Sequence, residues 1–476
     1  MLLGPGLAVA ADLLQVYRDA LSYDAQYAAA RAQLDAGREK LPQGRAGLLP
    51  TVVLNANTQW NDYDFKQPFP GPRKYNSNGY SVQLTQPLFH WQNWIQYDQG
   101  KLQAAQAETQ FATATQDLIL RVAQAYFDVL LAEDSLGVVG AQKTAISEQL
   151  EQAKRNFEVG TATIVDTHEA QARYDLVVAQ EIAAANDLEV KRQALRQIIG
   201  KVPDSLLPLR DKVAIRPPEP KDLDQWVSAA EKDAFSVQVQ QAALDIASRE
   251  VDRNRAGHYP TLDLVASRNY VKQGATVTSA TPSATEYDST VLGVQLAVPL
   301  YQGGLVTSRT REAAALREKA LQDLESTRRA SAQNARQAYL GVTSGLAQVS
   351  ALEQALVSSQ SALDSNKLGY EVGVRINIDV LNAQQQLYST RRDLSKARYD
   401  TLLAQLRLKA AAGTLGEADL VAVNGLLGAP GAEAATAPAV SPTSSPSDAG
   451  KRSASPAPKD PAPRQGVPQR APTAPR

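Results

Sequence analysis

Two kinds of hydrophobic pattern alternate along this chain of 476 residues. Apolar residues recur at spacings of three and four through two long stretches without proline, residues 93–158 and 304–371. This periodicity predicts helices of about 65 residues, about 100 Å long, packed as left-handed coiled coils. Between the helical stretches, apolar and polar residues alternate one by one, which predicts β-strands.

Shorter helices are predicted beside the long ones. Helical periodicity indicates four further helices of about 35 residues, over 12–47, 163–199, 222–257 and 376–412. Two of these placed end to end match the length of one long helix. Val159-Gly160 and Val372-Gly373 are the predicted reversal points, because glycine readily adopts turn conformations. We therefore expect two antiparallel helical hairpins that form a long rod.

The alternating stretches predict two β-hairpins, over residues 50–89 and 260–300. In the first strand Leu54 and Ala56 point to one face and Asn55 to the other. Such strands fit either a soluble sheet packed on a helix or a membrane barrel with lipid outside and water inside. We favour the barrel, because no other sequence remains to cover the sheet.

Four strands are too few for a closed barrel, since the smallest barrels use about eight, and open edges are not tolerated in lipid. The chain must therefore oligomerise. We prefer a trimer with twelve strands to a dimer. The predicted fold class is mainly α, with a long antiparallel coiled-coil helical barrel and a membrane β-barrel.

The second half of the chain repeats the first after about 210 residues, outside the usual solenoid period. The clearest matches are Lys154, Glu158, Val159, Gly160 and Asp166, which recur as Lys367, Glu371, Val372, Gly373 and Asp379. We infer two copies of one large unit, each supplying half of a pseudo-symmetric subunit.

Composition excludes several kinds of site. The net charge is −1 without a basic stripe, so we expect no nucleic-acid partner. The chain has no cysteine, which excludes disulfides, thiolate metal sites, a cysteine nucleophile and a lipid-modified N-terminal cysteine. Its three histidines are far apart in the sequence and lack metal-ligand spacing. We expect no metal, no cofactor and no catalytic site.

The two ends of the chain differ from its body. Residues 1–11 are rich in Leu, Val and Ala and include Ala8-Val9-Ala10, which suggests the remnant of a signal peptide. A short disordered N-terminus is the alternative. Residues 429–476, rich in Pro, Ala and Ser, are expected to be disordered. The body divides into a first repeat over 12–210 and a second over 211–428, and no transmembrane helix is expected.

Several motifs together resemble the TolC family of outer-membrane efflux and secretion channels, over about residues 12–425. The motifs are Leu13-Leu14-Gln15-Val16-Tyr17, Gly257-His258-Tyr259-Pro260-Thr261-Leu262-Asp263-Leu264, Pro299-Leu300-Tyr301-Gln302-Gly303-Gly304, Phe157-Glu158-Val159-Gly160 and Gly369-Tyr370-Glu371-Val372-Gly373. The resemblance implies a homotrimer with a twelve-stranded outer-membrane barrel on a periplasmic helical barrel. It also implies an equatorial collar built from residues 200–222 and 413–428.

The resemblance further implies a gate at the periplasmic entrance, held by the tips of the two helical hairpins. The first-hairpin acid of this gate falls on Asp166, and its partners fall on Tyr370 and Arg375. Arg155 stands where the family has a gate glutamine and offers Asp166 an alternative partner. The alternative role for Asp166, compatible with a gate, is that of a helix N-cap.

A ring of acids that narrows the pore and binds cations is also implied. It falls on Asp379, for which a helix N-cap is again the alternative, while the second ring acid is replaced by Asn382. One ring of charges is therefore missing, and we expect weaker block by cations.

The implied function is that of a passive exit duct in the outer membrane of a Gram-negative bacterium, extending into the periplasm, and not of an enzyme. Its partners would be outer-membrane lipid, a periplasmic adaptor (membrane fusion) protein and an inner-membrane ABC transporter or other pump. We favour type I protein secretion over multidrug efflux. A structural periplasmic coiled-coil rod is the alternative from another class.

Overall fold

The computed structural model describes residues 10–428, apart from 68–69, 202, 204, 211–212 and 275–282. The expected tail and residues 1–9 of the expected leader lie outside the described residues.

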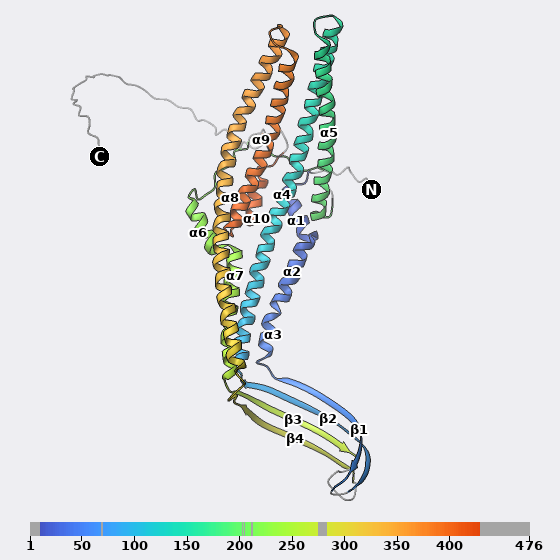
Figure 1. The fold of residues 1–476 in the computed structure, drawn as a ribbon, viewed down its shortest axis with the longest axis vertical. Helices are drawn as coiled ribbons and strands as arrows, with labels where there is room; N and C mark the ends of the chain where they lie inside the picture. The colour runs from blue at the N-terminus through green and yellow to red at the C-terminus, as the bar shows by residue number, and fades with distance from the viewer. Residues whose placement is uncertain are drawn as a thin grey trace, which may run out of the picture. The chain divides into compact units, whose positions relative to one another are not determined.

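Two long helical hairpins form the core of the helical part (Figure 1). Helix α4 (Trp91–Glu158) has 68 residues and packs against α5 (Ile164–Ile199). Helix α8 (Leu305–Glu371) has 67 residues and packs against α9 (Asn377–Ala411). The chain reverses where Gly160 and Gly373 adopt positive φ angles of 76° and 77°, which glycine tolerates without a Cβ clash. The predicted long helices and their turns are confirmed.

The shorter helices differ from the prediction, because each N-terminal segment is broken. The segment predicted as one helix over 12–47 forms three helices, α1 (Leu13–Tyr23), α2 (Ala25–Arg38) and α3 (Lys40–Ala46). Asp24 breaks the first join, since its extended backbone lets the side chain accept a hydrogen bond from the Tyr27 amide as an N-cap.

The corresponding segment of the second repeat, predicted as one helix over 222–257, also breaks. It forms α6 (Leu223–Asp233) and α7 (Phe235–Arg255), followed by the 3₁₀ turn η1 (Ala256–His258). Ala234 separates the two helices with a ψ of 133°, outside the helical range. Helices α2 and α3 pack along α4, while α7 contacts both α4 and α8.

The main hydrophobic core lies where α1, α4, α5, α9 and the short helix α10 (Glu417–Asn424) meet. Tyr126 is fully buried there, and its hydroxyl donates a 2.8 Å hydrogen bond to the Leu207 carbonyl. Burial raises the pKa of the Tyr126 phenol. Leu209 and Leu427 form an antiparallel bridge, so the segments expected to form the equatorial collar lie together.

Ala11, expected at the end of the leader, belongs to this folded core. It forms a parallel bridge with Leu206, its amide donating to the Ser205 carbonyl at 2.9 Å. The ordered body therefore includes Ala11.

Asp24 also joins the short helices to α4 through a buried ion pair. Its carboxylate, 6% exposed, accepts two hydrogen bonds from the Arg121 guanidinium at 2.8 and 2.9 Å. These bonds hold the pKa of Asp24 below its ordinary value. The carboxylate therefore contributes stability above its unfolded-state pKa of about 4, and this contribution is lost as the pH falls through the lower folded-state pKa.

The substitution Asp24→Asn is expected to lower the free energy of unfolding at pH 7 by about 2 kcal/mol, because it leaves Arg121 without its buried charge partner. The amide oxygen keeps the helix cap, so the effect reports the ion pair. Denaturant unfolding at pH 7 and pH 3 measures it, with the difference between the proteins shrinking at pH 3. Asp12→Asn, at the N-cap of α1, is the control. An equal loss in both variants would contradict the assignment.

The four predicted strands form one antiparallel sheet in the order β1-β2-β3-β4. The strands are β1 (Thr51–Phe65), β2 (Gly71–Phe89), β3 (Thr261–Gln273) and β4 (Thr285–Ala297). The two hairpins are confirmed, and β2 of the first repeat pairs with β3 of the second. Strands β1 and β4 are the edges of this sheet. Figure 1 shows the sheet leading away from the end of the helices where α3 finishes.

Candidate functional site

One face of the sheet is apolar and exposed. The strand register places Leu54 opposite Val82 and Leu264 opposite Val294, so these residues share a face. The residues of this face, which we call the apolar band, are Val52, Leu54, Ala56, Tyr80, Val82, Leu84, Leu262, Leu264, Ala266, Leu292, Val294 and Leu296. Leu54 is 68% exposed and Leu292 73%. A soluble sheet would need a helix packed over this band, and no described helix covers it.

The opposite face of the sheet is polar. One row of paired residues crosses all four strands, from Asn55 through Ser81 and Asn269 to Ser289. The Asn269 amide donates to the Ser289 hydroxyl at 3.3 Å. A sheet with apolar residues on one side and such rows on the other matches a wall between lipid and water.

Aromatic residues lie at both ends of the apolar band. Towards the strand turns, Tyr80 and Tyr270 stack with their ring centroids 5.2 Å apart. Towards the helices, exposed aromatic rings come from Phe89, Trp91, Trp94, Tyr259 and Tyr301. Arg268 precedes Tyr270 by two positions on the same face, and its long side chain can reach the polar boundary beyond the Tyr rings. Aromatic residues at both borders are typical of membrane-spanning sheets.

The tips of the two helical hairpins hold the residues expected to form the gate. The Val159-Gly160 and Val372-Gly373 turns lie there, with Val159 and Val372 exposed. Arg375 and Asp379 form an ion pair at 3.6 Å within one turn. Asp379 lies in the first turn of α9, whose N-cap position is Ile376. The alternative assignment of Asp379 as an N-cap is therefore wrong.

Asp166 also takes a different place from the predicted cap. Thr163 is the N-cap of α5, and its hydroxyl accepts from the Asp166 amide. The Asp166 carboxylate completes this capping box by accepting from the Thr163 amide at 3.0 Å and from its hydroxyl at 2.8 Å. Asp166 thus stabilises the start of α5, and its pairing with Tyr370 or Arg375, of the same or a neighbouring subunit, remains a prediction.

Tyr370 and Arg155 contact other residues within the chain. The Tyr370 hydroxyl accepts a 3.2 Å hydrogen bond from the Asn156 amide, which joins the tips of the two hairpins. The Arg155 Nε donates to the Glu151 carbonyl of its own helix at 3.2 Å. Within one chain, Arg155 therefore lies on the α4 surface and not in contact with Asp166.

Polar residues missed by the sequence reasoning form a seam between the two hairpins. Asn377 is fully buried and accepts a 2.6 Å hydrogen bond from the Gln149 amide, while its own amide donates to the Asp166 carbonyl. Further along, the Arg173 guanidinium donates to Asn382 at 3.0 Å and to Gln385 at 2.7 Å. The sequence did contain a signal for this seam, namely polar residues at helix positions that face a packed neighbouring helix. Asn382 is thus held by a cation from α5.

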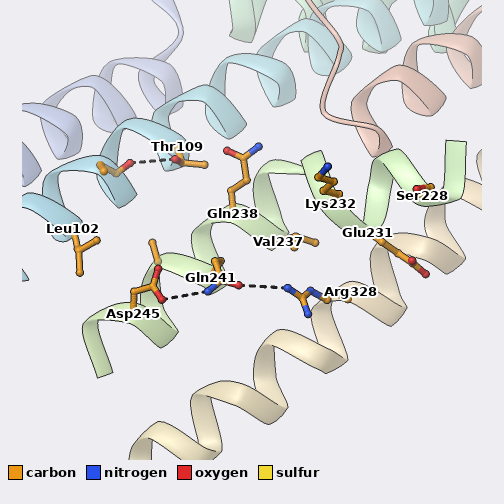
Figure 2. Close-up of a pocket in the computed structure, with 12 residues that line it drawn as sticks. Leu102, Thr109, Ser228, Glu231, Lys232, Val237, Gln238, Gln241, Asp245 and Arg328 are labelled. Carbon is orange, nitrogen blue, oxygen red and sulfur yellow. Dashed lines mark hydrogen bonds between the residues drawn. The ribbon is translucent and has the colours of Figure 1, made fainter. Parts of the chain in front are cut away.

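A separate cavity of about 580 Å³ lies between α4, α6, α7 and α8. Figure 2 shows its polar wall, where Gln241 donates to Asp245 at 3.3 Å and accepts from Arg328 at 3.4 Å. Lys232 and Glu231 also line it. None of the residues expected at the gate or the ring lines this cavity, so it is distinct from the hairpin tips.

Among the described residues, the acidic and histidine side chains form no group of three or more that could hold a metal ion. None of the helices that these residues form combines the length and apolar character needed to cross a membrane.

Comparison with known proteins connects these features. The family model for outer membrane efflux proteins matches residues 16–201 and 226–414. The chain is 35% identical over 415 residues to the outer membrane protein TolC of Vibrio cholerae, covering 87% of this chain and 93% of that protein. It is 36% identical over 425 residues to the alkaline protease secretion protein AprF of Pseudomonas aeruginosa, covering 87% and 86%.

A solved structure supports the same fold. The outer membrane protein VceC from Vibrio cholerae matches with a TM-score of 0.72 at 18% identity, over 84% of this chain and 96% of that one. At this identity the likeness concerns the fold alone.

Proposed function

Because the chain belongs to the outer membrane efflux protein family, an outer-membrane family of channels for secretion and efflux, we propose that it forms a trimeric duct with a gated periplasmic entrance. The observation that carries this proposal is the sheet, whose apolar band is uncovered and whose edges β1 and β4 are open. Backbone groups at an open edge would lack hydrogen bonds in lipid.

An assembly of three chains would cover the apolar bands with lipid and pair the open edges. Pairing β4 of one chain with β1 of the next gives twelve strands and leaves no edge, with each apolar band facing lipid. The polar rows then line a lumen, and the helical hairpins continue the duct into the periplasm. The alternative of a structural rod leaves the apolar bands without a partner.

The proposed entrance lies at the hairpin tips. Arg375 would leave Asp379 for Asp166 of a neighbouring chain, or share both, and Tyr370 would support the contact. Such exposed ion pairs contribute about 0–1 kcal/mol each. Three copies therefore hold the entrance shut by an amount that docking of a partner can overcome.

We propose that the duct serves type I protein secretion, in which an inner-membrane ABC transporter and a periplasmic adaptor supply the energy and open the entrance. The 36% sequence identity with a protease secretion protein, over most of both chains, supports this choice. Export of small molecules by a multidrug efflux pump is the second candidate, supported by the matching family description. The duct itself would catalyse no reaction.

Single-channel recording of the purified protein in planar bilayers tests the duct. We expect small cation-selective current steps, blocked by trivalent cations added on the periplasmic side, because three Asp379 carboxylates would face the narrowest part of the lumen. Asp379→Ala is expected to abolish most of this block. Absence of current from a folded, membrane-inserted oligomer would reject the duct in favour of a rod, while block that survives in Asp379→Ala would remove Asp379 from the ring.

A further inference from the structure

We propose that Arg173 is a positioning residue of the entrance, which holds the first helical hairpin against the second within each chain. This inference rests on the proposed function for its consequence, but the tie itself is a property of one chain. Arg173 lies on α5 of the first repeat, and both of its acceptors, Asn382 and Gln385, lie on α9 of the second.

The geometry of the tie is specific to an arginine. Two different guanidinium nitrogens, Nη1 and Nη2, donate to side chains one helical turn apart, at 2.7 and 3.0 Å. A planar fork of donors can contact two such acceptors at once, whereas a lysine ammonium is a single point of contact. Hydrogen bonds from a charged donor are also shorter and stronger than neutral ones.

Packing around the tie combines an apolar cluster with a small cavity. Val177 of α5 and Leu381 of α9 belong to one small apolar cluster with residues of α4. Beside this cluster is a cavity of about 150 Å³, lined by Arg173, Val177, Leu381 and Gln385 among others. The two hairpins are therefore incompletely packed at this level. Val177 and Leu381 are almost fully buried in this cluster, so the Arg173 hydrogen bonds act together with an apolar contact between α5 and α9.

The tie also changes the expected role of Asn382. From the sequence, Asn382 is expected to replace an acid of the ring and so to remove one ring of charges. In the structure its amide oxygen is the acceptor for Arg173. The tie therefore gives Asn382 a contact within the chain that does not depend on a ring.

The test uses Arg173→Ala in the full-length protein, with Arg192→Ala as the matched control. Arg192 lies on the same helix, but its 2.9 Å ion pair with Glu133 joins α5 to α4 inside the first hairpin. The chain has no cysteine, so Ala179→Cys and Asp393→Cys place spin labels on α5 and α9 alone. Pulsed electron paramagnetic resonance then measures the distance between the hairpins, and bilayer recording measures current on the same proteins.

We expect Arg173→Ala to lengthen and broaden the α5–α9 distance, Arg173→Lys to lengthen it less, and Arg192→Ala to leave it unchanged. The open probability of the channel should rise in Arg173→Ala, by about fivefold for each chain that loses about 1 kcal/mol of contact. A distance distribution identical to that of the wild type would overturn the tie. A longer distance in a protein that carries no current in any variant would uphold the tie and reject the duct instead.

Discussion

Replacement of Arg375 by serine is expected to raise the channel conductance at neutral pH several-fold. Arg375 is the basic residue of the proposed entrance, and its guanidinium lies 3.6 Å from Asp379 in the same chain. Loss of about 1 kcal/mol per chain gives about 3 kcal/mol in a trimer, which shifts the balance between closed and open entrances by about two orders of magnitude. Single-channel recording in planar bilayers measures the change.

The same substitution makes a second, separate prediction about the ion preference. Removing a positive charge beside Asp379 strengthens the negative potential of the proposed ring, so the cation selectivity should rise together with the conductance. Arg317→Ser on the exposed surface of α8 is the control and should change neither property. Equal conductance in wild type and Arg375→Ser would remove Arg375 from the gate.

Replacement of Val294 by lysine is expected to prevent assembly in the membrane. Val294 lies within the apolar band on β4 and is 62% exposed. A lysine on the lipid-facing side of a membrane sheet costs about 2–4 kcal/mol near the bilayer centre. In a trimer three copies would share the same level, so the cost would be tripled. Heat-resistant oligomer in outer-membrane fractions, detected by gel electrophoresis, should be greatly reduced.

The adjacent residue supplies the matched control for this experiment. Gln295 points to the opposite, polar face of β4, where a lysine would stay in water. Gln295→Lys should therefore assemble normally, while its added positive charges in the lumen reduce cation selectivity. Loss of the oligomer in both variants would contradict the assignment of the two faces.

The sequence predicted the long elements well, because their signals extend over many residues. Apolar residues at spacings of three and four over more than 60 residues define α4 and α8. Alternation of apolar and polar residues defines the four strands. The breaks at Asp24 and Ala234 escaped prediction, since each depends on the backbone of a single residue. Nothing in the local pattern distinguishes Asp24 from an exposed helical residue until its capping bond to Tyr27 and its pair with Arg121 are known.

The candidate site was predicted less completely, for a physical reason. Residues at the hairpin tips were located through family resemblance, but their partners depend on tertiary contacts. Asp166 completes a capping box with Thr163, and Arg173 reaches residues more than 200 positions away. Contacts between repeats at such separation leave no periodic signal in the sequence. The proposed gate contacts between subunits depend in addition on the assembly of several chains.

The open edges of the sheet affect how the protein assembles. In a single chain, β1 and β4 are unpaired and the apolar band is exposed. The exposed band is unfavourable in water, and the unpaired edges are unfavourable in lipid. Unpaired edge strands of this kind readily pair with other chains. Completion of the proposed barrel would then depend on encounters between chains, so its rate and yield should depend steeply on their concentration. Dilution of the chains before assembly should therefore lower the yield of assembled protein.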